Sequence, residues 1–149
     1  MIPMKHADSA EALFSQGFAC SQAIFSAYAT EYGLNNDTAL KVSSGFGGGM
    51  GRMAQTCGAV TGAYMVIGLK YGAVSGQDQE AKLKTYRLVR EFAERFKAKN
   101  GSLVCRDLLG CDISTPEGAE EMKRKGLHGS VCMKLVHDAC DLLDEMLKD

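Results

Sequence analysis

The sequence lacks any excess of positive charge. Its 149 residues include 17 lysines and arginines against 18 aspartates and glutamates, a net charge of −1. No basic stripe is present, so we expect no nucleic-acid partner. The first residues, MIPMKHADSAEALF, lack the apolar segment of a secretory signal, and we therefore expect a cytoplasmic protein. The uncharged run from Met53 to Leu69 is short for a membrane span, and a buried helix is the better interpretation.

Sustained alternation of apolar and polar residues, the pattern of half-buried strands, is also absent. Apolar residues recur instead at helical spacing, which predicts an all-α fold. We expect one domain over residues 1–149, a bundle of about six to eight helices. The expected helices are Ala7 to Gln16, Cys20 to Tyr32, a short one ending at Ser43, Thr56 to Tyr71, Asp78 to Lys99, Leu103 to Leu109, Pro116 to Lys125, and Ser130 to Leu147.

Two of these helices have a distinct pattern. In Asp78 to Lys99 the apolar positions fall on one face, which predicts that they point inward. They are Leu83, Tyr86, Val89, Phe92, Ala93 and Phe96. In Thr56 to Tyr71, Gly58 and Gly62 recur four residues apart beside Ala59 and Ala63, which predicts close approach of a second helix. We expect this glycine-rich helix at the centre of the bundle.

Charge is nearly missing from Val42 to Leu69, where Arg52 is the only charged residue. Such a stretch is expected to be buried or to face a ligand. It begins with five glycines between Gly45 and Gly51, too many for a helix interior, so a turn or a close backbone approach is predicted. No strand precedes them and no Gly-Lys-Ser/Thr follows, which argues against a nucleotide phosphate loop. The alternatives are a tight structural turn or a backbone cradle in which Gly47, Gly48, Gly49 and Arg52 hold an anionic cofactor or substrate.

The six cysteines contain no C-x-x-C pair, so neither a thioredoxin-like motif nor a zinc ribbon is indicated. Without a sign of export, metal binding or catalytic thiol chemistry is favoured over structural disulfides. Four cysteines fall in the first turn of an expected helix, where the helix dipole favours a thiolate: Cys20, Cys57, Cys105 and Cys132. Cys111 lies in an expected loop and Cys140 inside the last helix.

Other interpretations of these residues stay open. Any one of the cysteines can equally serve as a small buried hydrophobe, and this is favoured for Cys140. The three histidines are expected to make surface or local contacts. His128, four residues before Cys132, is the one kept as a candidate ligand or base.

The block around Cys57 resembles a family of redox-active proteins named for a C…GCAxxG…C…C pattern, described beside transporter genes. The similar segments are ACSQAI around Cys20, GFGGGMGRMAQTCGAVTGAYMVIGLKYG around Cys57, CRDLLG from Cys105, and VCMKLV around Cys132. The central motif reads Cys57-Gly58-Ala59 here. The resemblance implies that the family's four cysteines are Cys20, Cys57, Cys105 and Cys132, with Cys111 and Cys140 as additional ones.

Three functional hypotheses follow. The first is a thiol redox protein in which Cys57 is the nucleophile of lowered pKa and Cys20, Cys105 or Cys132 resolves the mixed disulfide. The second is a protein whose same four cysteines bind zinc or an iron–sulfur cluster. The third is a non-catalytic helical module that binds a partner such as a transporter. A redox partner is expected under the first hypothesis, and a homo-oligomer is compatible with all three.

Overall fold

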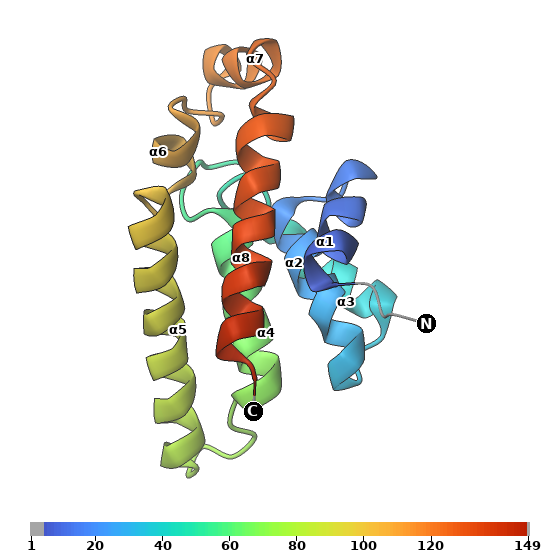
Figure 1. Ribbon diagram of the computed structural model, residues 1–149, viewed down its shortest axis with the longest axis vertical. Helices are drawn as coiled ribbons and strands as arrows, with labels where there is room; N and C mark the ends of the chain where they lie inside the picture. The colour runs from blue at the N-terminus through green and yellow to red at the C-terminus, as the bar shows by residue number, and fades with distance from the viewer. Residues whose placement is uncertain (1–4, 149) are drawn as a thin grey trace.

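The computed structural model describes residues 5–148 and shows an all-helical bundle (Figure 1). The all-α prediction is confirmed: the described residues form eight α-helices in one domain and no strand. The α-helices are α1 (His6–Ser15), α2 (Cys20–Ala29), α3 (Asn36–Ser43), α4 (Gly58–Tyr71), α5 (Gln79–Asn100), α6 (Cys105–Leu109), α7 (Pro116–Arg124) and α8 (Met133–Met146). Short helical turns are η1 (Thr30–Tyr32), η2 (Ser44–Phe46) and η3 (His128–Cys132), the last a π-helical turn that leads into α8.

Helix α4 is the centre of the bundle and packs against α2, α5 and α8. Its side chains Val60, Val66 and Ile67 are fully buried, as a helix that is apolar on all sides requires. The expected start at Thr56 is wrong by two residues. Thr56 forms an isolated antiparallel bridge with Val104, and Cys57 is the N-cap, so the helix begins at Gly58.

Several helix ends follow the expected chemistry. The side chains of Asn35, Asp78 and Thr115 accept hydrogen bonds from backbone amides in the first turns of α3, α5 and α7. Pro116 is the first residue of α7, as predicted. The first helix begins at His6 rather than Ala7, with Lys5 as N-cap.

The prediction that the apolar side chains of α5 point inward is wrong for the first half of the helix. Leu83 and Tyr86 are 63% and 57% exposed, whereas Phe92 and Phe96 are fully buried. Figure 1 shows the reason, because the N-terminal end of α5 extends past the end of α8 and has no helix to cover it there. The apolar stripe of α5 therefore becomes part of the core only along its second half.

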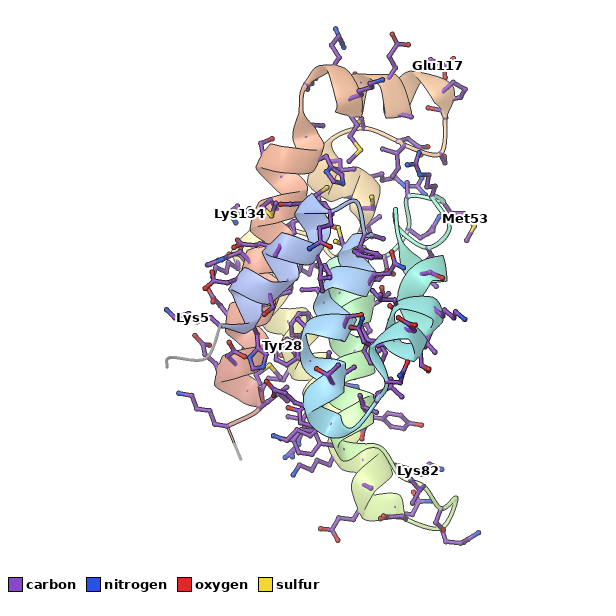
Figure 2. All side chains as sticks on the ribbon, turned by 90° about the vertical axis from the view of Figure 1, so that its right-hand side faces the viewer. Lys5, Tyr28, Met53, Lys82, Glu117 and Lys134 are labelled. Carbon is purple, nitrogen blue, oxygen red and sulfur yellow. The ribbon has the colours of Figure 1, made fainter. Side chains whose placement is uncertain are left out.

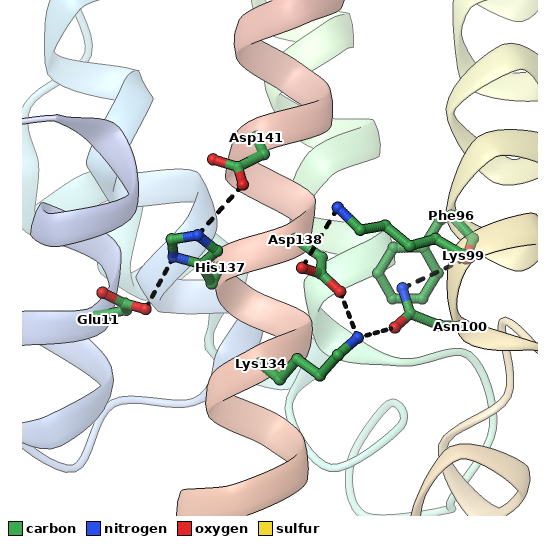
Figure 3. Close-up of polar contacts among 8 residues, drawn as sticks. All are labelled: Glu11, Phe96, Lys99, Asn100, Lys134, His137, Asp138 and Asp141. Carbon is green, nitrogen blue, oxygen red and sulfur yellow. Dashed lines mark hydrogen bonds and ion pairs between the residues drawn. The ribbon is translucent and has the colours of Figure 1, made fainter.

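Polar contacts connect α8 to its neighbours on both sides (Figure 3). The carboxylate of Asp138, 5% exposed, lies 2.7 Å from Lys134 Nζ and 3.5 Å from Lys99 Nζ of α5. On the other side, His137 Nδ1 lies 3.1 Å from Glu11 Oε1 of α1. These contacts hold α8 between α1 and α5, where it packs against α4. None of the described helices combines the length and apolar character needed to cross a membrane.

Candidate functional site

Backbone pairing places two of the four predicted cysteines side by side. The amide of Cys57 donates to the carbonyl of Leu103 at 2.8 Å, and the amide of Cys105 donates to the carbonyl of Gln55 at 2.6 Å. These bonds flank the Thr56–Val104 bridge. The segment before α4 and the segment before α6 therefore run antiparallel, and Cys57 and Cys105 are held at the same end of the bundle.

A close contact between α2 and α4 brings Cys20 to the same place. A Cβ atom added to Gly58 would lie 3.0 Å from the Ser21 nitrogen and 3.1 Å from Cys20 Cβ. At Gly62 the added atom would lie 2.9 Å from the Ser21 carbonyl oxygen. The small-residue prediction for this helix is thus confirmed, because side chains at Gly58 and Gly62 would keep the start of α2 away from Cys57.

The glycine cluster forms a left-handed turn, which confirms the prediction of a turn with close backbone approach. The five residues from Gly48 to Arg52 all have positive φ, between 60° and 71°. A Cβ atom on Gly49 would lie 2.7 Å from Cys105 Cβ, and one on Gly47 would lie 2.5 Å from Ala19 Cβ. The loop therefore fits between the starts of α2 and α6, which only residues without side chains allow.

This loop also holds non-glycine residues in a costly conformation. Met50, Arg52 and Ala54 have φ values of 69°, 61° and 58°. Left-handed backbone costs an ordinary residue roughly 1–2 kcal/mol. Strain of this kind persists where surrounding contacts enforce it and is frequent at functional sites.

Cys132 reaches the site from a helix interior rather than a helix start. It is the last residue of the π-helical turn η3, and its backbone continues into α8 in helical conformation. The expectation that Ser130 begins the helix is therefore wrong by two residues, since the helical turn already includes His128 and Gly129. The π turn is itself a feature often found at functional sites.

All four of these cysteines line one cavity of about 1150 Å³. The cavity lies beneath α7, at the end of the molecule where Figure 2 labels Glu117 and Met53. Gly47, Gly48, Gly49 and Arg52 line the same cavity. The wall includes the apolar side chains Phe14, Phe18, Leu108, Leu109, Ile113, Met122 and Leu135. Segments far apart in the chain are thus brought to one space.

Two cysteines of the cavity interact directly. The thiol of Cys20 hydrogen-bonds to Cys132, and this bond lowers the pKa of Cys132. The same bond, together with burial and the neighbouring Cys57 and Cys105, raises the pKa of Cys20 well above its ordinary value. Cys132 is therefore the more readily ionised thiol of the pair, and Cys20 is the one that holds its proton more firmly.

The other two cysteines are held as neutral thiols. Burial raises the pKa of Cys57 to about 11, although hydrogen bonds from the amides of Ala59 and Val60 act in the opposite direction. Burial, with Cys57 and Cys132 nearby, raises the pKa of Cys105 to about 12. The expectation of a lowered pKa at Cys57 is therefore wrong. The helix start does favour its thiolate, but the removal of water costs the charged form more.

The two remaining cysteines do not line the cavity. Cys140 is fully buried in α8, and burial raises its pKa to about 12. Cys111 is partly exposed between α6 and α7. All six cysteines are free thiols in the described chain.

The histidines divide as follows. His6 and His137 make local contacts, His6 with Asp144 at 2.8 Å and Glu31 at 2.6 Å, and His137 with Glu11. His128 lines the cavity and stacks on Phe14 with ring centroids 4.1 Å apart. The stacking holds the His128 ring at the site, but it gives no evidence that His128 transfers a proton.

Sequence reasoning missed the contribution of α7. The sequence of this helix has the pattern of an ordinary polar surface segment. Four of its residues nevertheless line the cavity: Glu120, Met122, Lys123 and Arg124. No local signal marks them, because their position depends on the way in which α7 folds over the cysteines. The described histidine, cysteine, aspartate and glutamate side chains include no group of three or more arranged to hold a metal ion.

Comparison with known proteins agrees with the cysteine pattern. The family model described as "Putative redox-active protein (C_GCAxxG_C_C)" matches residues 18–146, which includes all four cavity cysteines. Searches of curated proteins and of solved structures give no match. With most of its length matched, the chain belongs to the C_GCAxxG_C_C family of putative redox-active proteins.

Proposed function

We propose that this protein carries out thiol–disulfide exchange with Cys20 and Cys132 as its reacting pair. The observation that supports the proposal most directly is that Cys20 and Cys132 line the same cavity, where each side chain shifts the pKa of the other. A disulfide requires two cysteines that the fold brings together, and the reacting species in this chemistry is the thiolate. Free thiols suit a reducing compartment, and the cytoplasm is the proposed location.

The exchange oxidises the protein and reduces a disulfide substrate. The Cys132 thiolate attacks one sulfur of the substrate, so that a mixed disulfide forms and the other half leaves as a thiolate, which takes up a proton. The Cys20 thiol then loses its proton and attacks the sulfur of Cys132. The second half of the substrate leaves as a thiol, and a Cys20–Cys132 disulfide remains. Two cysteine thiols are oxidised for each substrate disulfide reduced.

Cys57 and Cys105 have a supporting role in this proposal. Their raised pKa values keep them protonated at neutral pH, so they do not compete with Cys132 for the first attack. Both lie close enough to raise the pKa of Cys20, which keeps the proton on Cys20 and the charge on Cys132. The nucleophile expected at Cys57 is therefore proposed at Cys132 instead.

The test is disulfide mapping after a single oxidation. Protein reduced without oxygen is treated with one equivalent of a small disulfide, blocked with N-ethylmaleimide, digested and analysed by mass spectrometry. We expect the Cys20 and Cys132 peptides to be joined, and to separate again after dithiothreitol. Cys140→Ser and Cys111→Ser serve as matched controls and should leave this link unchanged.

Two outcomes would contradict the proposal. One is the absence of any reversible disulfide between Cys20 and Cys132. The other is a stoichiometric metal in anaerobically purified protein whose loss frees these two thiols, which would favour metal binding instead. Metal analysis of the same preparation therefore accompanies the mapping.

A further inference from the structure

Three basic side chains border the cysteine cavity. Arg52 comes from the left-handed loop, and Lys123 and Arg124 come from the last turn of α7. Within residues 5–148, none of the three forms an ion pair or a side-chain hydrogen bond. By contrast, the neighbouring Lys125 lies 3.5 Å from Glu121. The cationic groups at the cavity are thus free to contact a bound molecule.

The cavity differs in charge from the rest of the protein. Glu120 is the single acidic residue among the described residues that line it, so the lining has an excess of two positive charges before the Cys132 thiolate is counted and of one after it. The whole chain has a net charge of −1. A cavity of one charge sign with low-dielectric walls concentrates ligands of the opposite sign. The cavity is therefore suited to an anion.

The left-handed loop adds donors of the same kind. Across the described part of the chain, the amides of Gly48 and Gly49 donate no hydrogen bond, and both residues line the cavity. Successive free amides in such a turn form an anion-binding concavity. These two donors supplement the three basic side chains, which supply the charge.

The rest of the lining includes many apolar side chains, which limits what kind of anion fits. Phe14, Phe18, Leu109 and Ile113 lie among the lining residues, together with the four cysteines. The volume of about 1150 Å³ is slightly above the range of roughly 300–1000 Å³ typical of small-molecule sites. A ligand with an apolar middle and anionic ends matches both the apolar and the basic residues of the lining.

We propose that the substrate of this site is a small disulfide that carries carboxylate groups. Arg52, Lys123 and Arg124 hold its carboxylates, and the apolar wall receives its central part, so that the S–S bond reaches Cys132. The inference rests on the proposed exchange function, and the reaction balance is the one given above. The reduced cysteine pair supplies both electrons, and two carboxylate-bearing thiols are released.

The test compares three disulfides that differ in charge. These are 3,3′-dithiodipropionate with two negative charges, the neutral bis(2-hydroxyethyl) disulfide, and cystamine with two positive charges. Each rate of Cys20–Cys132 oxidation is divided by the rate of the same disulfide with 2-mercaptoethanol, which removes differences in leaving-group reactivity. At low salt we expect the dianion to be favoured about tenfold or more over the neutral compound, with cystamine slowest.

Charge-matched variants locate the effect. One triple variant combines Arg52→Gln, Lys123→Gln and Arg124→Gln, and it should lose the preference for the dianion. The control is a second triple variant on α5, which lies away from the cavity, with Arg87→Gln, Arg90→Gln and Lys97→Gln. It loses the same number of arginines and lysines and should keep the preference. Equal normalised rates for all three disulfides, or equal effects of the two triple variants, would overturn the inference.

A non-reactive ligand separates this inference from the proposed function. Suberate has the chain length and charges of 3,3′-dithiodipropionate but no sulfur, and its binding is followed by amide shifts in NMR spectra. We expect shifts at Gly48 and Gly49 that vanish in the combined variant of Arg52, Lys123 and Arg124. Suberate binding without oxidation by any disulfide would leave anion recognition intact and refute the exchange function. If the normalised oxidation rates are the same for all three disulfides and suberate does not bind, this inference is refuted and the exchange function is not.

Discussion

The thiol of Cys20, the first residue of α2, hydrogen-bonds to Cys132 at the end of the π-helical turn before α8. The bond joins two segments near opposite ends of the chain. It also makes the two cysteines unequal, since Cys20 retains its proton and Cys132 is stabilised as a thiolate. This asymmetry gives a direct prediction for thiol reactivity.

Removal of the donor should raise the pKa of Cys132. A hydrogen bond to a charged group contributes about 1.5–3 kcal/mol, which corresponds to about one to two pH units. In Cys20→Ala we therefore expect the pH midpoint for iodoacetamide labelling of Cys132 to rise by about one unit or more. Cys20→Ser retains a hydroxyl donor and should stay closer to the parent. Equal midpoints in both variants would show that the bond does not control Cys132.

The contact between α2 and α4 predicts that Gly62→Ala destabilises the protein. The new methyl group would lie 2.9 Å from the Ser21 carbonyl oxygen and 3.0 Å from Ile24 Cβ, too close without movement of α2. We expect a loss of about 1–3 kcal/mol in the free energy of unfolding, measured with urea. Gly68→Ala in the same helix meets nothing within 4 Å and should be neutral or stabilising. Similar values for the two variants would contradict the close packing.

The left-handed loop predicts a difference between two of its own glycines. Gly49→Ala places a methyl group 2.6 Å from the Gln55 nitrogen and 2.7 Å from Cys105 Cβ, in addition to the cost of positive φ. Gly51→Ala has the same backbone cost but meets only the Gly45 carbonyl oxygen at 3.9 Å. We expect Gly51→Ala to lose about 1–2 kcal/mol and Gly49→Ala to lose more. Urea unfolding of both variants measures the difference, and the reverse order would contradict the close approach of the loop to Cys105.

Buried neutral thiols predict a loss of stability in alkali. Cys140 titrates at a pKa of about 12 in the folded protein, against about 8.5 for a free thiol. The unfolded chain releases its proton first, so stability is present below about pH 8.5 and falls as the pH rises toward 12. At about pH 9.5 the loss from this thiol is about 1.4 kcal/mol.

In Cys140→Ala the free energy of unfolding should fall less steeply with rising pH, by about 1.4 kcal/mol at about pH 9.5. This holds whatever the substitution costs at neutral pH. The relevant quantity is the slope of unfolding free energy against pH, measured from about pH 8 to 10. Cys111→Ala is the control, because Cys111 is partly exposed rather than buried. An unchanged slope in Cys140→Ala would contradict the assignment.

Much of the fold could be predicted from local patterns. Apolar spacing and the N-terminal proline of α7 placed the helices to within about two residues at most ends. The failures have a common cause. Thr56 and the first half of α5 depend on which segment lies beside them: Thr56 pairs with Val104, and Leu83 and Tyr86 are left mostly exposed.

The sequence by itself determined the helices, the need for a close approach at Gly58 and Gly62, and the set of four cysteines. Only the tertiary structure decided how these cysteines relate. Burial raised the pKa values of Cys57 and Cys105, and the interaction with Cys20 from a distant segment lowered the pKa of Cys132. It also brought Lys123 and Arg124 to the cavity. Desolvation and contacts between remote segments set the properties of a thiol, and neither is encoded in the spacing of residues along the chain.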